Sequence, residues 1–148
     1  MSISRKISTI TSAAALRAVQ VAVDHAATRG AAVVVAVVDA GGVLMASLRA
    51  DGAFAASVDI ARDKAWTAAI FGASTDDLCA ALSKREVVRE GLALRPGVVL
   101  FGGGLPIRLD GNIIGGIGVS GGSEDDDRAS AAAGLHALGL ETASAAVI

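Results

Sequence analysis

The hydrophobic and polar positions of this chain follow helical spacing in some stretches and strand spacing in others. Four stretches are predicted to be helices, because they combine helix-forming residues with apolar positions three or four apart, or because they follow a capping residue. They are residues 12–29, 57–72, 74–92 and 124–138. Gly30 supplies the stop after the first helix, and Ser74 or Thr75 can cap the third.

Five short runs between these helices are typical of strands. They are rich in β-branched residues, and they lie at 31–39, 43–49, 98–101, 107–109 and 112–120. Tight turns at 39–42 and 110–111 join neighbouring runs as hairpins. Because hairpins rather than helical crossovers connect most strands, we expect an α+β domain: a mainly antiparallel sheet of about five strands flanked by helices.

The length and composition indicate one domain with more apolar surface than a single core would bury. At 148 residues, the chain is long enough for one core, and we expect a single domain over 1–148. Hydrophobic residues make up 53% of it, so part of the small apolar surface is expected to lie against another subunit. The net charge of −2, without a basic cluster carrying aromatic residues, argues against nucleic-acid binding.

Targeting and membrane signals are not evident. The first 20 residues contain no apolar run long enough for a secretory signal, and the aliphatic run 31–38 is far shorter than the ~20 residues that span a bilayer. The single cysteine, Cys79, cannot form an internal disulfide or a Cys-x-x-Cys metal site. We therefore expect a cytoplasmic protein that does not bind membranes.

Residues 115–127, GGIGVSGGSEDDD, match two catalytic signatures at once. Residues 116–121 fit the dinucleotide pattern G-x-G-x-x-G, and 118–122 fit the nucleophile elbow G-x-S-x-G. The first fails because only a final helix follows, with no further parallel strand. The second fails because the only downstream histidine, His136, lies about four helical turns away from Ser120. Ser123 and Asp126 instead predict a capping box.

Two glycine-rich stretches remain to be explained: residues 115–122, inside and just after a strand, and the loop 102–104 before Leu105 and Pro106. Glycine weakens a strand unless something approaches the backbone closely, so a cluster of glycines needs a reason. If the loops lie at the ends of neighbouring strands, their backbone N–H groups could frame a pocket. The ligand-binding candidates from these loops are Gly103, Gly104, Pro106, Ser120, Gly121 and Gly122. Tight turns are the alternative explanation.

Charged residues in this hydrophobic chain are candidates for chemistry. Asp39, Lys64 and Asp127 could serve as catalytic acids and bases, with a lysine pKa lowered by burial. Arg49 and Asp51 flank the end of the hairpin, where the arginine could clamp an anionic substrate. Structural explanations exist as well. Asp39 is a typical turn former, Arg49 and Asp51 could form a surface pair, and Lys64 could be a salt-bridge partner.

The possible iron ligands are few and scattered. They are the two histidines, His25 and His136, together with Met45 and Cys79. No pair has the Glu-x-x-His or His-x-x-x-His spacing, so no protein-built metal centre is expected. His25 is kept as a candidate for ligand binding.

Several motifs taken together resemble one known family. They are VAVVDAGGVLMASLRADGA, ARDKAWTAAIF and FGGGLPIRLDGNIIGGIGVSGGSEDDDRASAAA, spread over residues from about 12 to 138. In this combination the chain resembles the haem-binding-protein HbpS/GlcG family, whose domain also forms the C-terminal part of PduO proteins. The resemblance implies a profilin-like α/β/α sandwich and homo-oligomers from dimer to octamer.

The resemblance leaves two functions open. One is a small-molecule-binding protein whose ligand is haem or a related tetrapyrrole. The other is a cofactor-independent enzyme of hydroxy acid, diol or aromatic catabolism, with acid/base residues in an interface pocket. Leu105 stands where the family usually has an aromatic residue, and the chain has no tyrosine, so a flat ligand would lose one stacking partner.

Overall fold

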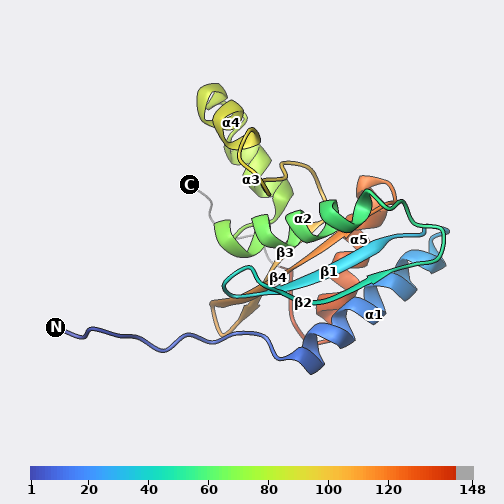
Figure 1. The fold of residues 1–148 in the computed structure, drawn as a ribbon, viewed down its shortest axis with the longest axis horizontal. Coiled ribbons are helices and arrows are strands. Elements are labelled where there is room, and N and C mark those ends of the chain that lie inside the picture. Colours follow the sequence, from blue (N-terminus) through green and yellow to red (C-terminus); the bar gives the residue numbers. More distant parts are fainter. Residues whose placement is uncertain (143–148) are drawn as a thin grey trace.

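A computed structural model describes residues 1–142. Its elements, in chain order, are α1 (Ser12–Thr28), β1 (Val34–Asp39), β2 (Leu44–Arg49), α2 (Ser57–Phe71), α3 (Thr75–Ala81), α4 (Glu86–Ala93), β3 (Gly104–Leu109), β4 (Asn112–Ser120) and α5 (Glu124–His136). The four strands form one antiparallel sheet in the order β2-β1-β4-β3 (Figure 1). Within these residues, no helix is both long and apolar enough to cross a membrane.

The sheet lies between helices on its two faces, which confirms the α+β class. Val33, Val35 and Val37 pack with α1 and α5, whereas Val34 packs with Ala61 of α2 and Val38 with Ala65. The valines alternate because successive side chains of a strand point to opposite faces. β1 is therefore apolar on both faces because it is covered on both.

Two expectations about element number were wrong. The sheet has four strands rather than five, because residues 98–101 form a loop: Val99 donates its N–H to the Thr67 hydroxyl of α2 at 3.0 Å instead of to a strand. β3 then begins at Gly104 and includes Pro106, which an edge strand tolerates without its N–H. The helix expected over 74–92 is two helices, since buried Leu78 and Leu82 anchor α3 while the segment after them is exposed.

The glycines inside β4 allow close packing of α2 on the sheet. A Cβ atom added to Gly116 would overlap the carbonyl oxygen of Ala65, and one added to Gly118 would overlap that of Ala61. The backbone of α2 therefore lies directly on the backbone of β4. The close approach expected from the glycine density exists at these two positions, and the approaching group is a helix.

Substituting Gly118 tests this packing. Gly118→Ala is expected to lower the free energy of unfolding by about 3 kcal/mol or more, because neither backbone can move without separating α2 from the sheet. Urea denaturation followed by circular dichroism measures the loss. Gly91→Ala in exposed α4 is the control: nothing lies within 4 Å of its added Cβ, so stability is expected to stay or to rise by up to about 1 kcal/mol. Equal stability of Gly118→Ala and the wild type would contradict this packing.

Candidate functional site

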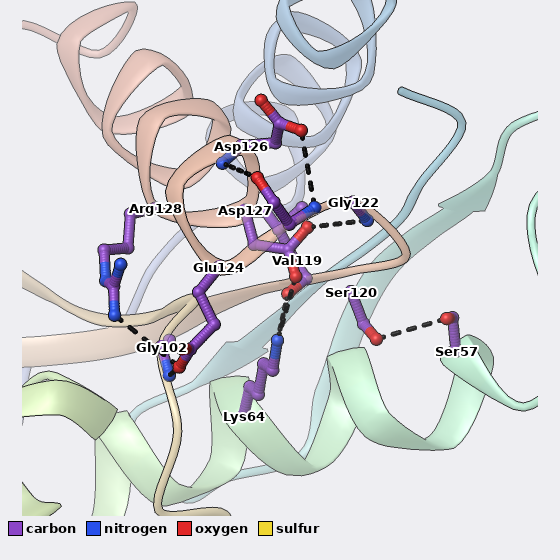
Figure 2. Close-up of polar contacts among 12 residues, drawn as sticks. Ser57, Lys64, Gly102, Val119, Ser120, Gly122, Glu124, Asp126, Asp127 and Arg128 are labelled. Atoms are coloured by element: carbon purple, nitrogen blue, oxygen red, sulfur yellow. Dashed lines mark hydrogen bonds and ion pairs between the residues drawn. The ribbon is translucent and has the colours of Figure 1, made fainter. Parts of the chain in front are cut away.

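Lys64 of α2 carries a buried positive charge at the centre of the fold. The residue is 1% exposed, and its Nζ donates to the carbonyl oxygen of Val119 at 2.8 Å and to Oδ2 of Asp127 at 3.1 Å. The other carboxylate oxygen of Asp127 accepts the N–H of Gly122 at 3.0 Å. Figure 2 shows Lys64 reaching from α2 toward the end of β4 and the first turn of α5. One ion pair thus joins three elements.

Burial and pairing act in opposite directions on these two groups. Burial lowers the pKa of Lys64 below its usual value, although the negative charge and hydrogen bond of Asp127 oppose this. Burial likewise raises the pKa of Asp127 above its usual value, against the attraction of Lys64. Desolvation is therefore the largest influence on the pKa of each group, and the charge of the partner opposes it.

The loop before β3 closes over this pair. Gly103 has a φ of +121°, and a Cβ there would lie 2.8 Å from Nζ of Lys64 and 2.6 Å from the Val119 carbonyl oxygen. The Phe101 ring adds a cation–π contact, with its centroid 5.0 Å from the same ammonium. The loop is therefore packed tightly against the charge, with no space for a side chain at Gly103.

Three N–H groups of the two glycine loops are already hydrogen-bonded to side chains. Gly102 donates to Glu124 at 2.8 Å, Gly104 to the Thr75 hydroxyl at 3.1 Å, and Gly122 to Asp127. The two loops do lie together, as the sequence suggested. Their donors, however, bind the protein itself, which leaves these three groups engaged.

Ser120 and the acidic run have structural partners. Ser120 donates its hydroxyl to the Ser57 hydroxyl at 3.1 Å, and both are buried. Ser123 and Asp126 form the capping box predicted from the sequence, which is confirmed. The four acidic residues in the first turn of α5 lie where the helix dipole favours negative charge.

The other candidate residues lie apart from the ion pair. Asp39 pairs with Gly115, five positions along β1 from the Val34–Ser120 pair, and its carboxylate accepts the N–H groups of Gly41 and Val43 in the turn. Arg49 lies at the Ser120 end of the sheet but two strands away. Asp51 is exposed beyond β2, and His25 is half-buried near the end of α1. Gly121, in contrast, lies next to the pair, because it directly precedes Gly122, whose N–H binds Asp127.

An open cleft lies elsewhere, along the free edge of β3. This β3 cleft, of about 300 Å³, is bounded by α3, β3 and α5, and its apolar part consists of Leu105, Pro106 and Ala132. A second hollow of about 530 Å³ shares Glu141 and Thr142 with it and is lined by His136. Pro106 is therefore a loop candidate that lines a cavity of ligand size.

Two arginines line the β3 cleft in different states. Arg128 is neutralised: its Nε and Nη2 bind both carboxylate oxygens of Asp76 at 2.8 and 2.7 Å, which holds the pKa of Arg128 above its usual value. Arg108 donates through Nη2 to the Gly72 carbonyl oxygen, whereas its Nε is buried without an acceptor. Among residues 1–142, no carboxylate pairs with Arg108, so its charge is available to an anion.

Sequence reasoning did not find Arg108 or Arg128. The available signal for Arg108 was a lone cation in the apolar strand that follows the GGGLP loop, and only the fold shows that this strand is an edge. Arg128 and His136 are eight residues apart on α5, which places them about 80° apart around that helix and about 12 Å apart along its axis.

Removing the buried ammonium tests its role and gives a pH dependence. Lys64→Met leaves Asp127 buried without its partner and is expected to lower the free energy of unfolding by about 3 kcal/mol or more at neutral pH. Without Lys64, burial raises the pKa of Asp127 further. A carboxyl whose pKa is higher folded than unfolded loses stability as the pH rises from the unfolded pKa, about 4, through the folded one, so the deficit should grow as the pH rises above about 4.

Urea denaturation at several pH values measures this deficit. Lys6→Met, at an exposed lysine, is the control and should match the wild type throughout. The double variant Lys64→Met/Asp127→Asn should lose the pH dependence, because no buried carboxyl remains. A deficit of Lys64→Met that is independent of pH would contradict the assignment.

The chain matches known proteins over almost its whole length. The family described as haem degrading protein HbpS-like matches residues 10–136. An uncharacterized 15.0 kDa protein from the dhaT-dhaS intergenic region of Citrobacter freundii is 40% identical over 130 residues, which cover 86% of this chain and 91% of that protein.

Solved structures agree in fold. The crystal structure of HbpS is similar with a TM-score of 0.85 and 34% identity, covering 93% of this chain and 96% of that one. The crystal structure of a PduOC:haem complex is similar with a TM-score of 0.82 and 31% identity, covering 90% and 98%. Both the family predicted from the motifs and the α/β/α architecture are therefore confirmed. The chain belongs to the HbpS-like family.

Proposed function

We propose that this chain is a small-molecule-binding protein whose ligand is haem or a related tetrapyrrole, held in the β3 cleft. The observation that carries the proposal is the guanidinium of Arg108, which pairs with no carboxylate among residues 1–142, beside an apolar surface, with a histidine in the adjoining hollow. The similarity to PduOC, whose structure holds haem, supports the choice of ligand.

The residues around the cleft fit the chemistry of such a ligand. Haem is a flat apolar ring with two carboxylates on one side, and Arg108 can bind one carboxylate while Leu105 and Pro106 contact the ring. His136 is exposed in the adjoining hollow, and imidazole is a common axial ligand of haem iron. When bound, haem would supply a redox-active iron.

Oligomerisation and location complete the proposal. The protein assembles from identical copies, as a dimer or up to an octamer, and works in the cytoplasm. Large apolar side chains that remain exposed support assembly; among them Phe54, Val87 and Leu94 are more than two-thirds exposed.

The alternative, a cofactor-independent enzyme, is supported by one pair of residues, Lys64 and Asp127. Lys64 and Asp127 are joined and have displaced pKa values, as acid/base catalysts often do. Both side chains are buried, and Asp39 and Arg49 lie apart from them. Ligand binding at the β3 cleft therefore has the stronger geometric support.

Haemin titration with histidine variants tests the ligand and its site. The wild type is expected to shift the Soret band and to saturate. His136→Ala should alter the position of the Soret band and weaken binding, because the imidazole is lost. His25→Ala, at the only other histidine, is the matched control and should behave as the wild type. A wild type without saturable binding would overturn the proposed ligand, and equal spectra for both variants would overturn the role of His136.

The role of Arg108 is tested by removing its own charge in one experiment and the carboxylates of haemin in another. Arg108→Met should weaken haemin binding by about tenfold or more, the cost of one charge-assisted hydrogen bond. The dimethyl ester of haemin, which lacks the carboxylates, should bind the wild type and Arg108→Met equally. Arg17→Met, at an exposed arginine of α1, is the control and should leave the affinity unchanged. If Arg108→Met affects haemin and its ester equally, Arg108 does not recognise the carboxylate.

A further inference from the structure

The segment 83–95, which we call the arm, is a folded element without a core of its own. It contains α4, and none of the residues of this helix is buried. Figure 1 shows α4 projecting beyond α3, on the side of the sheet away from α1. Helices shorter than ~12–15 residues are marginal in water, so a helix of 8 residues without a buried side chain would be stabilised by contact with a further surface.

The exposed surface of the arm is apolar and basic. Val87 is 83% exposed and Leu94 87%, and Val88 lies on the same helix. The arm carries four basic side chains (Lys84, Arg85, Arg89 and Arg95) and two acidic ones (Glu86 and Glu90), a net charge of +2. Because the whole chain carries −2, the remainder carries −4. The arm therefore has a charge opposite to that of the body of the same protein.

The base of the arm is fixed, so the arm is presented in a defined direction. On one side, Leu78 and Leu82 are fully buried at the end of α3. On the other, the Thr67 hydroxyl donates to the Gly97 carbonyl oxygen at 2.8 Å and accepts the N–H of Val99 at 3.0 Å. The arm leaves and rejoins the body at two anchored points.

The outer face of α2 offers the complementary surface. Val58 and Ile70 are exposed large apolar residues on this helix, with Trp66 half-buried between them. Asp59 and Asp63 lie on the same face, and their one basic neighbour, Arg62, contacts them only at 3.3 and 3.7 Å. This face is apolar with a net negative charge, and it lies on the same side of the sheet as the arm.

We propose that the arm of one copy packs against the outer face of α2 in a second copy. A two-fold axis makes the contact reciprocal, since each copy carries both surfaces, and the pair then closes without further growth. The arrangement covers the exposed valines of α4 and brings basic side chains to Asp59 and Asp63. It rests on the oligomeric part of the proposed function and is independent of the ligand.

Sedimentation velocity of the full chain tests the contact. The wild type is expected to sediment as a dimer or larger, and Val87→Asp/Val88→Asp should raise the dissociation constant by about tenfold or more. Leu16→Asp, at an exposed leucine of α1 on the opposite side of the sheet, is the control and should assemble as the wild type. Circular dichroism checks that each variant is folded.

Zero-length carbodiimide cross-linking of wild-type protein locates the contact without substitution. In a mixture of ¹⁴N- and ¹⁵N-labelled chains, Lys84, the only lysine of the arm, should couple to Asp59 or Asp63 in peptides of mixed isotope. Coupling of Lys84 only within one copy or to other carboxylates would overturn the proposal, and so would unchanged assembly of the arm variant. A monomeric wild type would overturn both the contact and the oligomeric state, whereas failure of haemin to bind would affect the ligand alone.

Discussion

The buried ammonium of Lys64 is the constraint on which the rest of this structure depends. A charge removed from water needs partners, and this one has a main-chain carbonyl on β4, a carboxylate on α5 and an aromatic ring from the loop before β3. Those contacts fix the positions of three segments that are far apart in sequence. The ion pair orders the fold at the point where its two glycine loops meet, and Lys64 and Asp127 remain predictions as catalytic groups.

Close packing of backbones makes that contact possible. Gly116 and Gly118 let α2 lie directly on β4, which brings Lys64 within reach of Val119. The same closeness engages the N–H groups of the loops with Glu124, Thr75 and Asp127, side chains of the protein itself. A ligand is therefore better accommodated at the free edge of the sheet, where Arg108 keeps an unpaired charge and an unsatisfied donor within the described chain.

Two regions of the surface carry the proposed binding and assembly. The β3 cleft combines small apolar residues with one available cation, a chemistry suited to a ligand that is apolar in its body and anionic at one end. The arm and the outer face of α2 combine apolar side chains with opposite charges. The abundance of alanine, valine and glycine serves both the close-packed interior and the surface proposed for assembly.

Local patterns of the sequence determined most of the elements, the hairpin of β1 and β2, the capping box at Ser123 and the family, because these depend on neighbouring residues and on motifs that occur in order. The tertiary structure alone decided what the elements contact. Residues 98–101 have strand composition, but Thr67 of α2 takes the N–H of Val99, and the segment stays a loop. Asp39 and Asp127 were both candidates for a catalytic carboxylate in the sequence. In the structure, Asp39 stabilises a turn and Asp127 pairs with a buried lysine. The reason is physical: burial, pairing and the free edge of a sheet arise from residues far apart in the chain, which no local spacing encodes.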